Sequence, residues 1–300
     1  RTFEPGEGPE PQQISGRDRV AFPGYFSSGA GAGGARPRDK QTFCVAPVTY
    51  TGHDALQRDI ANFRAALAGV TDQEPFLPSV APGSIEHWMW NEHYATQEEF
   101  VYAIAEAMHE EYKAVTDAGF TLQIDDPDMF DAYQIHTDFD MATYRKYAEL
   151  RIDALNHALR DIPREQIRLH VCWGSYHGPH RFDVPLSEVV DLFLKVKAQA
   201  YSIEASNPRH EHEWSVWKSM KLPDGATLIP GVVGHASDFI EHPELVAERL
   251  MRYAGIVGRE NLMAGTDCGL GPRVGHPSIA WAKFQALSEG AQLASAQLWS

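Results

Sequence analysis

The chain has 300 residues, with 26 Lys or Arg against 41 Asp or Glu, so its formal charge is −15. This length fits one α/β barrel or two ordinary domains. The composition, 43% apolar and 22% charged, is globular and excludes wholesale disorder. The acidic balance argues against a nucleic-acid or membrane partner, because both attract clustered Lys and Arg.

The first forty residues differ in composition from the rest. Residues 1–13 are polar and rich in Pro, Gly and Glu, and residues 27–38 form a Gly/Ala tract, SSGAGAGGARPR. Such a tract has almost nothing to bury, so it predicts a flexible loop. We therefore expect an irregular N-terminal segment, 1–40, followed by one folded domain, 41–300.

From residue 41 onward, short apolar runs rich in β-branched residues alternate with helical patterns. The predicted strands are Thr42–Thr49, Phe76–Val80, Thr121–Ile124, Ile167–Cys172, Ala200–Glu204, Thr227–Val233 and Asn261–Thr266. The predicted helices are Asp54–Ala68, one that begins at Thr96 with the capping box Thr96-x-x-Glu99, Met141–Ile162, Leu186–Ala198, Pro243–Gly255 and one from Pro277 to the end.

Strands separated by helices imply a parallel sheet, either doubly wound or closed into a (β/α)₈ barrel. No G-x-G-x-x-G follows an early strand, which removes the main support for a dinucleotide-binding sheet. The barrel is favoured, although only seven of its eight strands have a candidate. We expect an α/β fold of the (β/α)₈ TIM-barrel type, with its opening units absent from this chain.

The chain has three cysteines, too few and too scattered for a disulfide framework. There is no apolar run near the length of a membrane span, and no signal-peptide pattern at the start. We therefore expect a cytoplasmic protein that acts on small molecules, and we leave open whether it forms a homo-oligomer.

Several predicted strands end in residue types that bind metals. His170 and Cys172 lie two apart on one strand and so point to the same side, while Glu204 and Cys268 end later strands. Since parallel strands of a barrel end on one face, these side chains predict a zinc site with two sulfurs, one nitrogen and one oxygen. Taken singly, each cysteine is better explained as a small buried hydrophobe and His170 as a core histidine; the four ligand types together favour the metal site.

Zinc held by two thiolates would remove the proton from a substrate thiol that binds the metal, and the thiolate is the nucleophile. The pattern therefore points to alkyl transfer to sulfur. The chain resembles the catalytic barrel of the cobalamin-independent methionine synthases, in their short single-barrel type, from about Gln41 to its end. The segments that carry the resemblance are LQIDDPD (122–128), HVC (170–172), YSIEASN (201–207), IPGVV (229–233) and GTDCGLGPR (265–273).

The resemblance implies that His170, Cys172, Glu204 and Cys268 bind zinc. It also implies that Asp125 contacts the amino group of homocysteine, with Asp126 in the same substrate-binding set; a helix cap is the alternative for such an acid. Trp88 matches the residue that stacks on the pterin of methyltetrahydrofolate, with Trp90 as a rival. His235 lies nearest the general acid, and His177 is expected to line the pocket, whereas His210 and His212 are expected to be solvated.

The resemblance also exposes a difference. The family barrel opens with a strand ending in Gly-Ser and a second ending in Asp-Gly-Glu or His-Gly-Glu, and nothing in residues 1–40 matches them. Thr42–Thr49 is then an accessory strand, and Phe76–Val80 to Asn261–Thr266 are barrel strands three to eight. Either the chain lacks the first two βα units, or another chain supplies them.

Three functions remain in view. The first is a zinc-dependent methyltransferase of the methyltetrahydropteroyltriglutamate–homocysteine type, which would serve methionine biosynthesis from a methylfolate donor and a thiol. The second is an epoxyalkane–coenzyme M transferase, in which Arg181 and Arg273 are candidates for binding a sulfonate. The third is a non-catalytic zinc- or folate-binding barrel, or a metal-free barrel related to decarboxylases.

Overall fold

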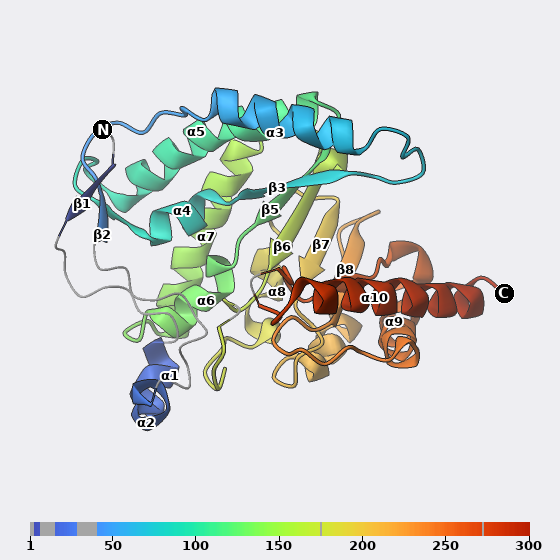
Figure 1. Cartoon of the computed structure of the whole chain (residues 1–300). Helices are drawn as coiled ribbons and strands as arrows, with labels where there is room; N and C mark the ends of the chain where they lie inside the picture. The colour runs from blue at the N-terminus through green and yellow to red at the C-terminus, as the bar shows by residue number, and fades with distance from the viewer. Residues whose placement is uncertain (1–2, 7–15, 29–40, 175, 272) are drawn as a thin grey trace.

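The computed structural model of the chain describes residues 3–6, 16–28, 41–174, 176–271 and 273–300. In these residues, six parallel strands form one sheet in the order β3-β5-β6-β7-β8-β9. The strands are β3 (Phe76–Val80), β5 (Thr121–Asp125), β6 (Ile167–Val171), β7 (Ala200–Ile203), β8 (Thr227–Val233) and β9 (Gly265–Thr266). The sheet curls into part of a barrel (Figure 1), so the α/β fold and its parallel strands are as predicted.

The strand register decides which side chains share a face. Val80 pairs with Asp125, Asp125 with His170, His170 with Ser202 and Ser202 with Ile229. Because alternate residues of a strand point to opposite sides, this row and the residues two positions along each strand face the inside of the curl. Cys172, two residues after His170, therefore belongs to the same inner face.

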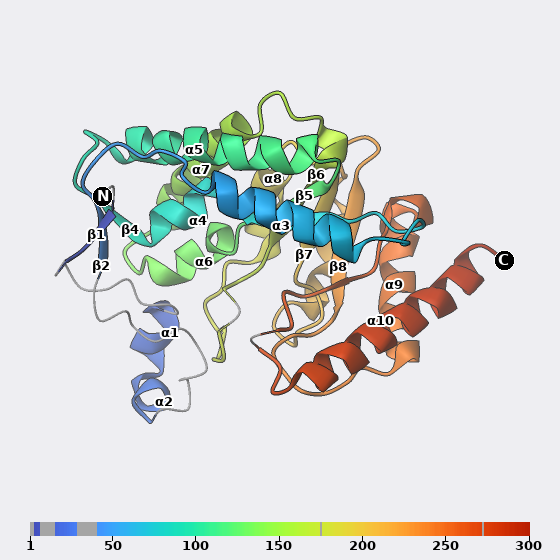
Figure 2. The same ribbon diagram turned by 45° about the horizontal axis from the view of Figure 1, so that its top comes forward.

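Helices cover the outer face of the sheet. Their bounds are α3 (His53–Ala66), α4 (Pro82–His87), α5 (Gln97–Asp117), α6 (Asp128–Ile135), α7 (Met141–Ala158), α8 (Val190–Phe193), α9 (Pro243–Val257) and α10 (Pro277–Leu298). In Figure 2, α3, α5 and α7 cover the side near β3, and α9 and α10 the side near β8. The predicted capping box starts α5, since the Thr96 side chain accepts a hydrogen bond from Glu99 N.

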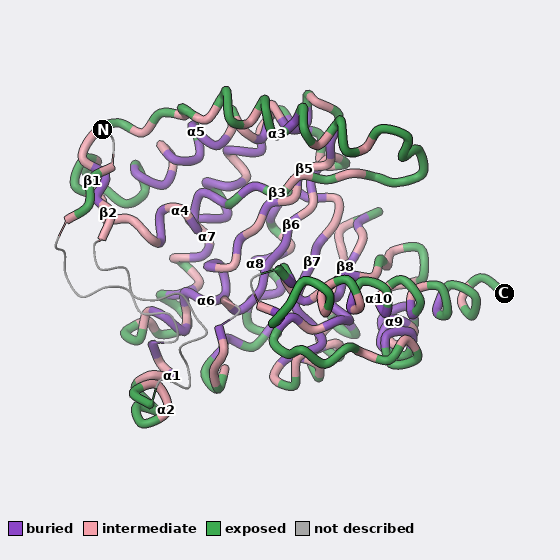
Figure 3. Tube along the Cα trace, viewed as in Figure 1, coloured by how far each residue is buried: buried purple, intermediate pink, exposed green. Residues whose placement is uncertain are grey.

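The core lies between this sheet and its helices. Figure 3 shows buried residues through the strands and along the inner sides of α5 and α7, and many exposed residues along α3 and α10. Leu122 and Ile124 of β5 and Leu169 of β6 have no exposed surface and pack against the helices. In the described residues, no helix is both long and apolar enough to cross a membrane.

The N-terminal part builds a second, small sheet and a helical segment. Strands β1 (Phe3–Gly6), β2 (Gln41–Cys44) and β4 (Met89–Asn91) form this sheet, in which β2 corresponds to the predicted accessory strand. Helices α1 (Gly16–Ala21) and α2 (Pro23–Ser27) lie in the range for which we expected irregular backbone. The Gly/Ala tract lies almost entirely outside the described residues.

Three predicted elements differ from the structure, of which the first is the strand expected over Thr42–Thr49, which ends at Cys44. The helix expected over Leu186–Ala198 is a 3₁₀ turn, Leu186–Glu188, followed by the single turn α8. Val189, with φ −135°, interrupts it. Val189, Val190 and Phe193 are all buried, so tertiary packing determines this segment more than helical periodicity does. The strand expected over Asn261–Thr266 is reduced to β9: Asn261 belongs to a 3₁₀ turn, Arg259–Asn261, and Leu262 forms an isolated bridge with Leu228.

Candidate metal centre

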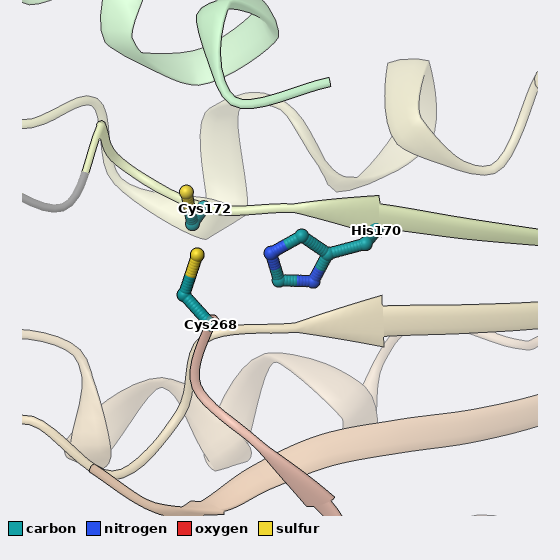
Figure 4. Close-up of side chains that lie close together, drawn as sticks. All are labelled: His170, Cys172 and Cys268. Atoms are coloured by element: carbon teal, nitrogen blue, oxygen red, sulfur yellow. The ribbon is translucent and has the colours of Figure 1, made fainter. Parts of the chain in front are cut away.

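Three of the four predicted ligands meet at the carboxyl ends of the strands. One potential ligand atom each from His170, Cys172 and Cys268 lies within 4.8 Å of the others. His170 lies on β6, and Cys172 directly follows β6. Cys268 comes shortly after β9, which is the last strand in the order of the sheet. Figure 4 shows the imidazole of His170 pointing toward the two sulfur atoms. The structure thus brings together residues almost a hundred positions apart in sequence.

The imidazole of His170 is held in one orientation. Its Nδ1 lies 3.2 Å from Ser202 Oγ on the neighbouring strand, and its Nε2 is buried without a hydrogen-bond partner in the described part of the chain. Burial opposes protonation of His170, but the thiol of Cys268 and the nearby acids outweigh it and raise its pKa. A buried ring nitrogen that faces two sulfurs is suited to ligate a soft or borderline metal.

Glu204, the fourth predicted ligand, belongs to a second group of side chains. Ligand atoms of Glu204, His235 and Asp267 lie within 4.8 Å of one another, and all three residues are buried. Glu204 Oε2 accepts a hydrogen bond from Trp173 N at 3.2 Å, and Oε1 accepts one from Asn207 Nδ2 at 2.5 Å. The role of Glu204 as a ligand stays a prediction, because its oxygens are directed at these donors.

His235, the predicted acid, is also in this second group. Its Nδ1 lies 4.0 Å from Glu204 Oε1, and in the described residues that nitrogen has no hydrogen-bond partner. Burial lowers the pKa of His235, against the opposing charge of Glu204. The His235 ring lies at the carboxyl ends of the strands, beside the group formed by His170, Cys172 and Cys268. Its catalytic role stays a prediction.

The predicted substrate-binding acids, Asp125 and Asp126, lie at the end of β5, the strand that pairs with the strand of His170. Asp125 pairs with His170 across β5 and β6 and accepts a hydrogen bond from Gln123 Nε2 at 2.7 Å. Asp126 is buried and accepts one from Ser84 Oγ at 3.0 Å; burial and the charge of Asp128 raise its pKa to about 7. Asp125, the last residue of β5, therefore lies on the inner face with His170, whereas the Asp126 side chain is directed at Ser84 of α4.

The two remaining predicted residues lie farther out. Trp88 ends α4, and its Nε1 donates a hydrogen bond to Asp128 Oδ2 at 3.3 Å. His177 lies in the loop after β6, and its carbonyl accepts a hydrogen bond from Tyr25 Oη of α2 at 3.3 Å. Their roles in binding a substrate stay predictions. His210, expected to be solvated, is instead buried between Asp183 and Glu213.

Sequence reasoning missed three residues that shape this centre. Ser202 orients His170, Trp173 N binds Glu204, and Asp267 is fully buried next to Cys268. Ser202 had a usable signal, because it lies two residues before Glu204 and so shares its face of the strand. The contacts of Trp173 and Asp267 depend on backbone geometry that a single sequence does not display.

Comparison with known proteins now identifies the family. The sequence model of the protein family described as the cobalamin-independent synthase catalytic domain matches residues 39–288. The chain belongs to this family. Methionine synthase of Thermococcus kodakarensis is 25% identical over 237 residues, which are 79% of this chain and 62% of that protein. The 2-hydroxypropyl-CoM lyase of Xanthobacter autotrophicus is 28% identical over 233 residues, covering 69% of this chain and 57% of that protein.

Solved structures agree on the fold. A B12-independent methionine synthase from Shewanella sp. W3-18-1, in complex with selenomethionine, superposes with a TM-score of 0.66 at 21% identity, covering 88% of this chain and 73% of that one. A putative vitamin-B12-independent methionine synthase from Listeria monocytogenes gives 0.61 at 16% identity, covering 84% and 73%. The chain spans 62% of the Thermococcus kodakarensis methionine synthase and 57% of the Xanthobacter autotrophicus lyase, which is less than two thirds of each relative.

Proposed function

We propose that this protein is a zinc-dependent methyltransferase that moves a methyl group from a methylfolate-type donor to a thiol such as homocysteine. The observation that carries the proposal is the convergence of His170, Cys172 and Cys268 at one end of the sheet, in a chain of this family. The name of the Thermococcus kodakarensis relative, methionine synthase, supports the same chemistry.

The residues at the centre fit zinc. Two thiols and one imidazole are a donor set that zinc prefers, and the buried Nε2 of His170 lacks another partner in the described chain. We assign His170, Cys172 and Cys268 to hold the metal, with Glu204 as the fourth ligand. Bound there, zinc would lower the pKa of a substrate thiol, so that the thiolate is available at neutral pH.

The remaining residues take roles around the transfer. Asp125, and Asp126 beside it, would bind the amino group of the acceptor, and Trp88 would stack on the pterin of the donor, with His177 lining the pocket. During transfer the carbon–nitrogen bond of the donor breaks and a carbon–sulfur bond forms. The thiol gives up its proton, and His235 would deliver one to the departing nitrogen.

One comparison favours a second candidate. The Xanthobacter autotrophicus relative is named 2-hydroxypropyl-CoM lyase, and this name supports coenzyme M as an alternative thiol. An epoxyalkane–coenzyme M transferase would use the same three metal-binding residues and differ only in what the outer residues recognise. The acceptor thiol is therefore the point that an experiment has to decide.

The test pairs metal analysis with turnover. We expect about one zinc per chain, and methionine formation from methyltetrahydrofolate and homocysteine, both measured by mass spectrometry. Cys268→Ser should lose zinc and turnover, whereas Cys44→Ser, a buried cysteine of β2 outside the site, should keep both. A Cys268→Ser protein that still binds stoichiometric zinc would contradict the ligand set.

The substrate outcomes separate the candidates. Zinc-loaded protein that converts coenzyme M and an epoxide, but not homocysteine, would replace the first proposal with the second. Zinc-loaded protein that is inactive with both pairs would favour a non-catalytic binding role. Protein that never takes up zinc would contradict both zinc-dependent candidates and favour the metal-free barrel.

A further inference from the structure

Asp267 lies where the ends of three strands come together. Its backbone N donates to Val233 O at 2.9 Å, which fixes it beside the end of β8. Its side chain reaches across β8 to the loop after β7. There Oδ1 accepts hydrogen bonds from Ala205 N at 2.7 Å and Ser206 N at 2.8 Å, and Oδ2 accepts one from Ser206 Oγ at 2.6 Å.

The close approach depends on Gly231 of β8. A Cβ placed on Gly231 would lie 2.3 Å from Asp267 Oδ1 and 2.5 Å from Asp267 Cα, far inside van der Waals contact. Only glycine at this position lets Asp267 pass over β8 to the loop beyond it. The Asp267 side chain has no exposed surface, so it is committed to this contact.

The contact joins two residues assigned to the metal. Ala205 directly follows Glu204, and Asp267 directly precedes Cys268. The three hydrogen bonds of Asp267 therefore fix the distance between the backbone of Glu204 and that of Cys268. Without them, β7 and β9 have no direct pairing, because β8 lies between them in the sheet.

A direct role for Asp267 as a metal ligand is the alternative, since it also lies near Glu204 and His235. The hydrogen bonds argue against it. Oδ1 already accepts from two backbone N–H groups and Oδ2 accepts from a hydroxyl, so the Asp267 carboxylate accepts three hydrogen bonds from the protein, whereas that of Glu204 accepts two.

We propose that Asp267 is a positioning residue that sets Cys268 and Glu204 in place for the metal by bonding the loop after β7. This inference rests on the proposed function, since it requires that the centre hold zinc. It adds that the affinity for the metal depends on a carboxyl group that never touches it. Outer partners of this kind commonly change metal affinity by about 10–100-fold when they are removed.

Two substitutions at one position separate the two roles. Asp267→Ala removes all three hydrogen bonds. Asp267→Asn keeps them, because the amide oxygen can accept from Ala205 N and Ser206 N while the amide nitrogen donates to Ser206 Oγ. A positioning residue should tolerate asparagine, but a metal ligand should not, since an amide is a much poorer zinc ligand than a carboxylate.

The measurements are zinc affinity by competition with a chelator and the thiolate-to-metal absorption of the cobalt-substituted protein. We expect Asp267→Ala to weaken zinc binding about 10–100-fold and to reduce the cobalt–thiolate band, because Cys268 moves. Asp267→Asn should resemble wild type, and Ser206→Ala should fall between them. Ser219→Ala is the matched control, since Ser219 Oγ donates only to the nearby Val216 O on an exposed turn.

Each outcome decides the inference. Equal losses in Asp267→Ala and Asp267→Asn would make Asp267 a ligand and overturn the positioning role, as would wild-type affinity and spectrum in Asp267→Ala. If thermal melting shows that metal-free Asp267→Ala does not fold, Ser206→Ala decides, and wild-type values there overturn the inference. A wild-type protein that binds no metal would overturn the proposed function and this inference together.

Discussion

Two neighbouring histidines, the buried His210 and the partly buried His180, provide a test of the structure that does not depend on the proposed reaction. His210 Nδ1 lies 2.9 Å from Glu213 Oε2, and its Nε2 lies 3.0 Å from Asp183 Oδ2. His180 Nδ1 lies 2.7 Å from the same Asp183 oxygen, and its Nε2 lies 2.8 Å from Tyr176 O. Every partner is an acceptor, and only a protonated imidazole can donate from both nitrogens.

The size of the effect follows from the pKa values. Burial opposes the charge, but the hydrogen bonds and charges of Asp183 and, for His210, Glu213 raise the pKa of each histidine from 6.5 to about 9. A rise of about 2.5 units, at 1.36 kcal/mol per unit, corresponds to about 3 kcal/mol per histidine. Because the folded pKa exceeds the unfolded one, this stabilisation is complete below about pH 6.5 and is lost as the pH rises through about 9.

The assay is urea denaturation of wild type and His210→Gln at several pH values. We expect His210→Gln to be less stable than wild type by about 3 kcal/mol at about pH 6, and the difference to shrink toward zero by about pH 10. His212→Gln, at an exposed position two residues away, is the control and should behave like wild type. A difference that stays constant over this range would show that stability is not linked to the protonation of His210 and would refute the reasoning.

Three other predictions follow from particular contacts. Lys283→Met should lower the free energy of unfolding by about 3–5 kcal/mol in urea denaturation, because the buried ammonium pairs with Glu241 at 3.1 Å; adding Glu241→Gln should recover much of the loss. Thr96→Ala should cost about 1 kcal/mol in the same assay, since it removes the cap of α5. Asp125→Asn should raise KM for the thiol acceptor while metal content by mass spectrometry stays at the wild-type level, because Asp125 lies beside the three donors but is not one of them.

Local patterns in the sequence were sufficient to predict most strands of the sheet. Strand β3 begins after Pro75 and ends before Ala81-Pro82, and β8 begins after Asp224-Gly225, so both apolar runs are bounded by residues that stop a strand. Their predicted bounds are confirmed. The spacing of His170 and Cys172 was sufficient to put both on the inner face, because that relation is set by the strand itself.

Contacts between residues far apart in the sequence leave no local pattern from which they could be predicted. Asp18 of α1 is fully buried and accepts a hydrogen bond from Tyr176 Oη at 2.5 Å, 158 residues away. An acidic residue near a polar N-terminus normally indicates an exposed segment, so its burial could not be foreseen. Glu204 shows the same limit: the strand fixes its face, but the donors Trp173 N and Asn207 Nδ2 fix the direction of its carboxylate.

The arrangement of the strands separates the candidate metal ligands from the residues predicted to bind the substrate. Both groups of ligand side chains come from β6, β7, β8 and β9 or the loops after them, four consecutive strands that hold one another in register. The predicted substrate residues Trp88 and Asp125 follow β3 or end β5, where β3 pairs with only one strand in the described part of the chain. There Phe76 and Val80, on the inner face, are 38% and 39% exposed. The candidate metal ligands therefore follow β6 to β9, and the residues predicted to recognise the substrate lie toward the β3 edge of the sheet.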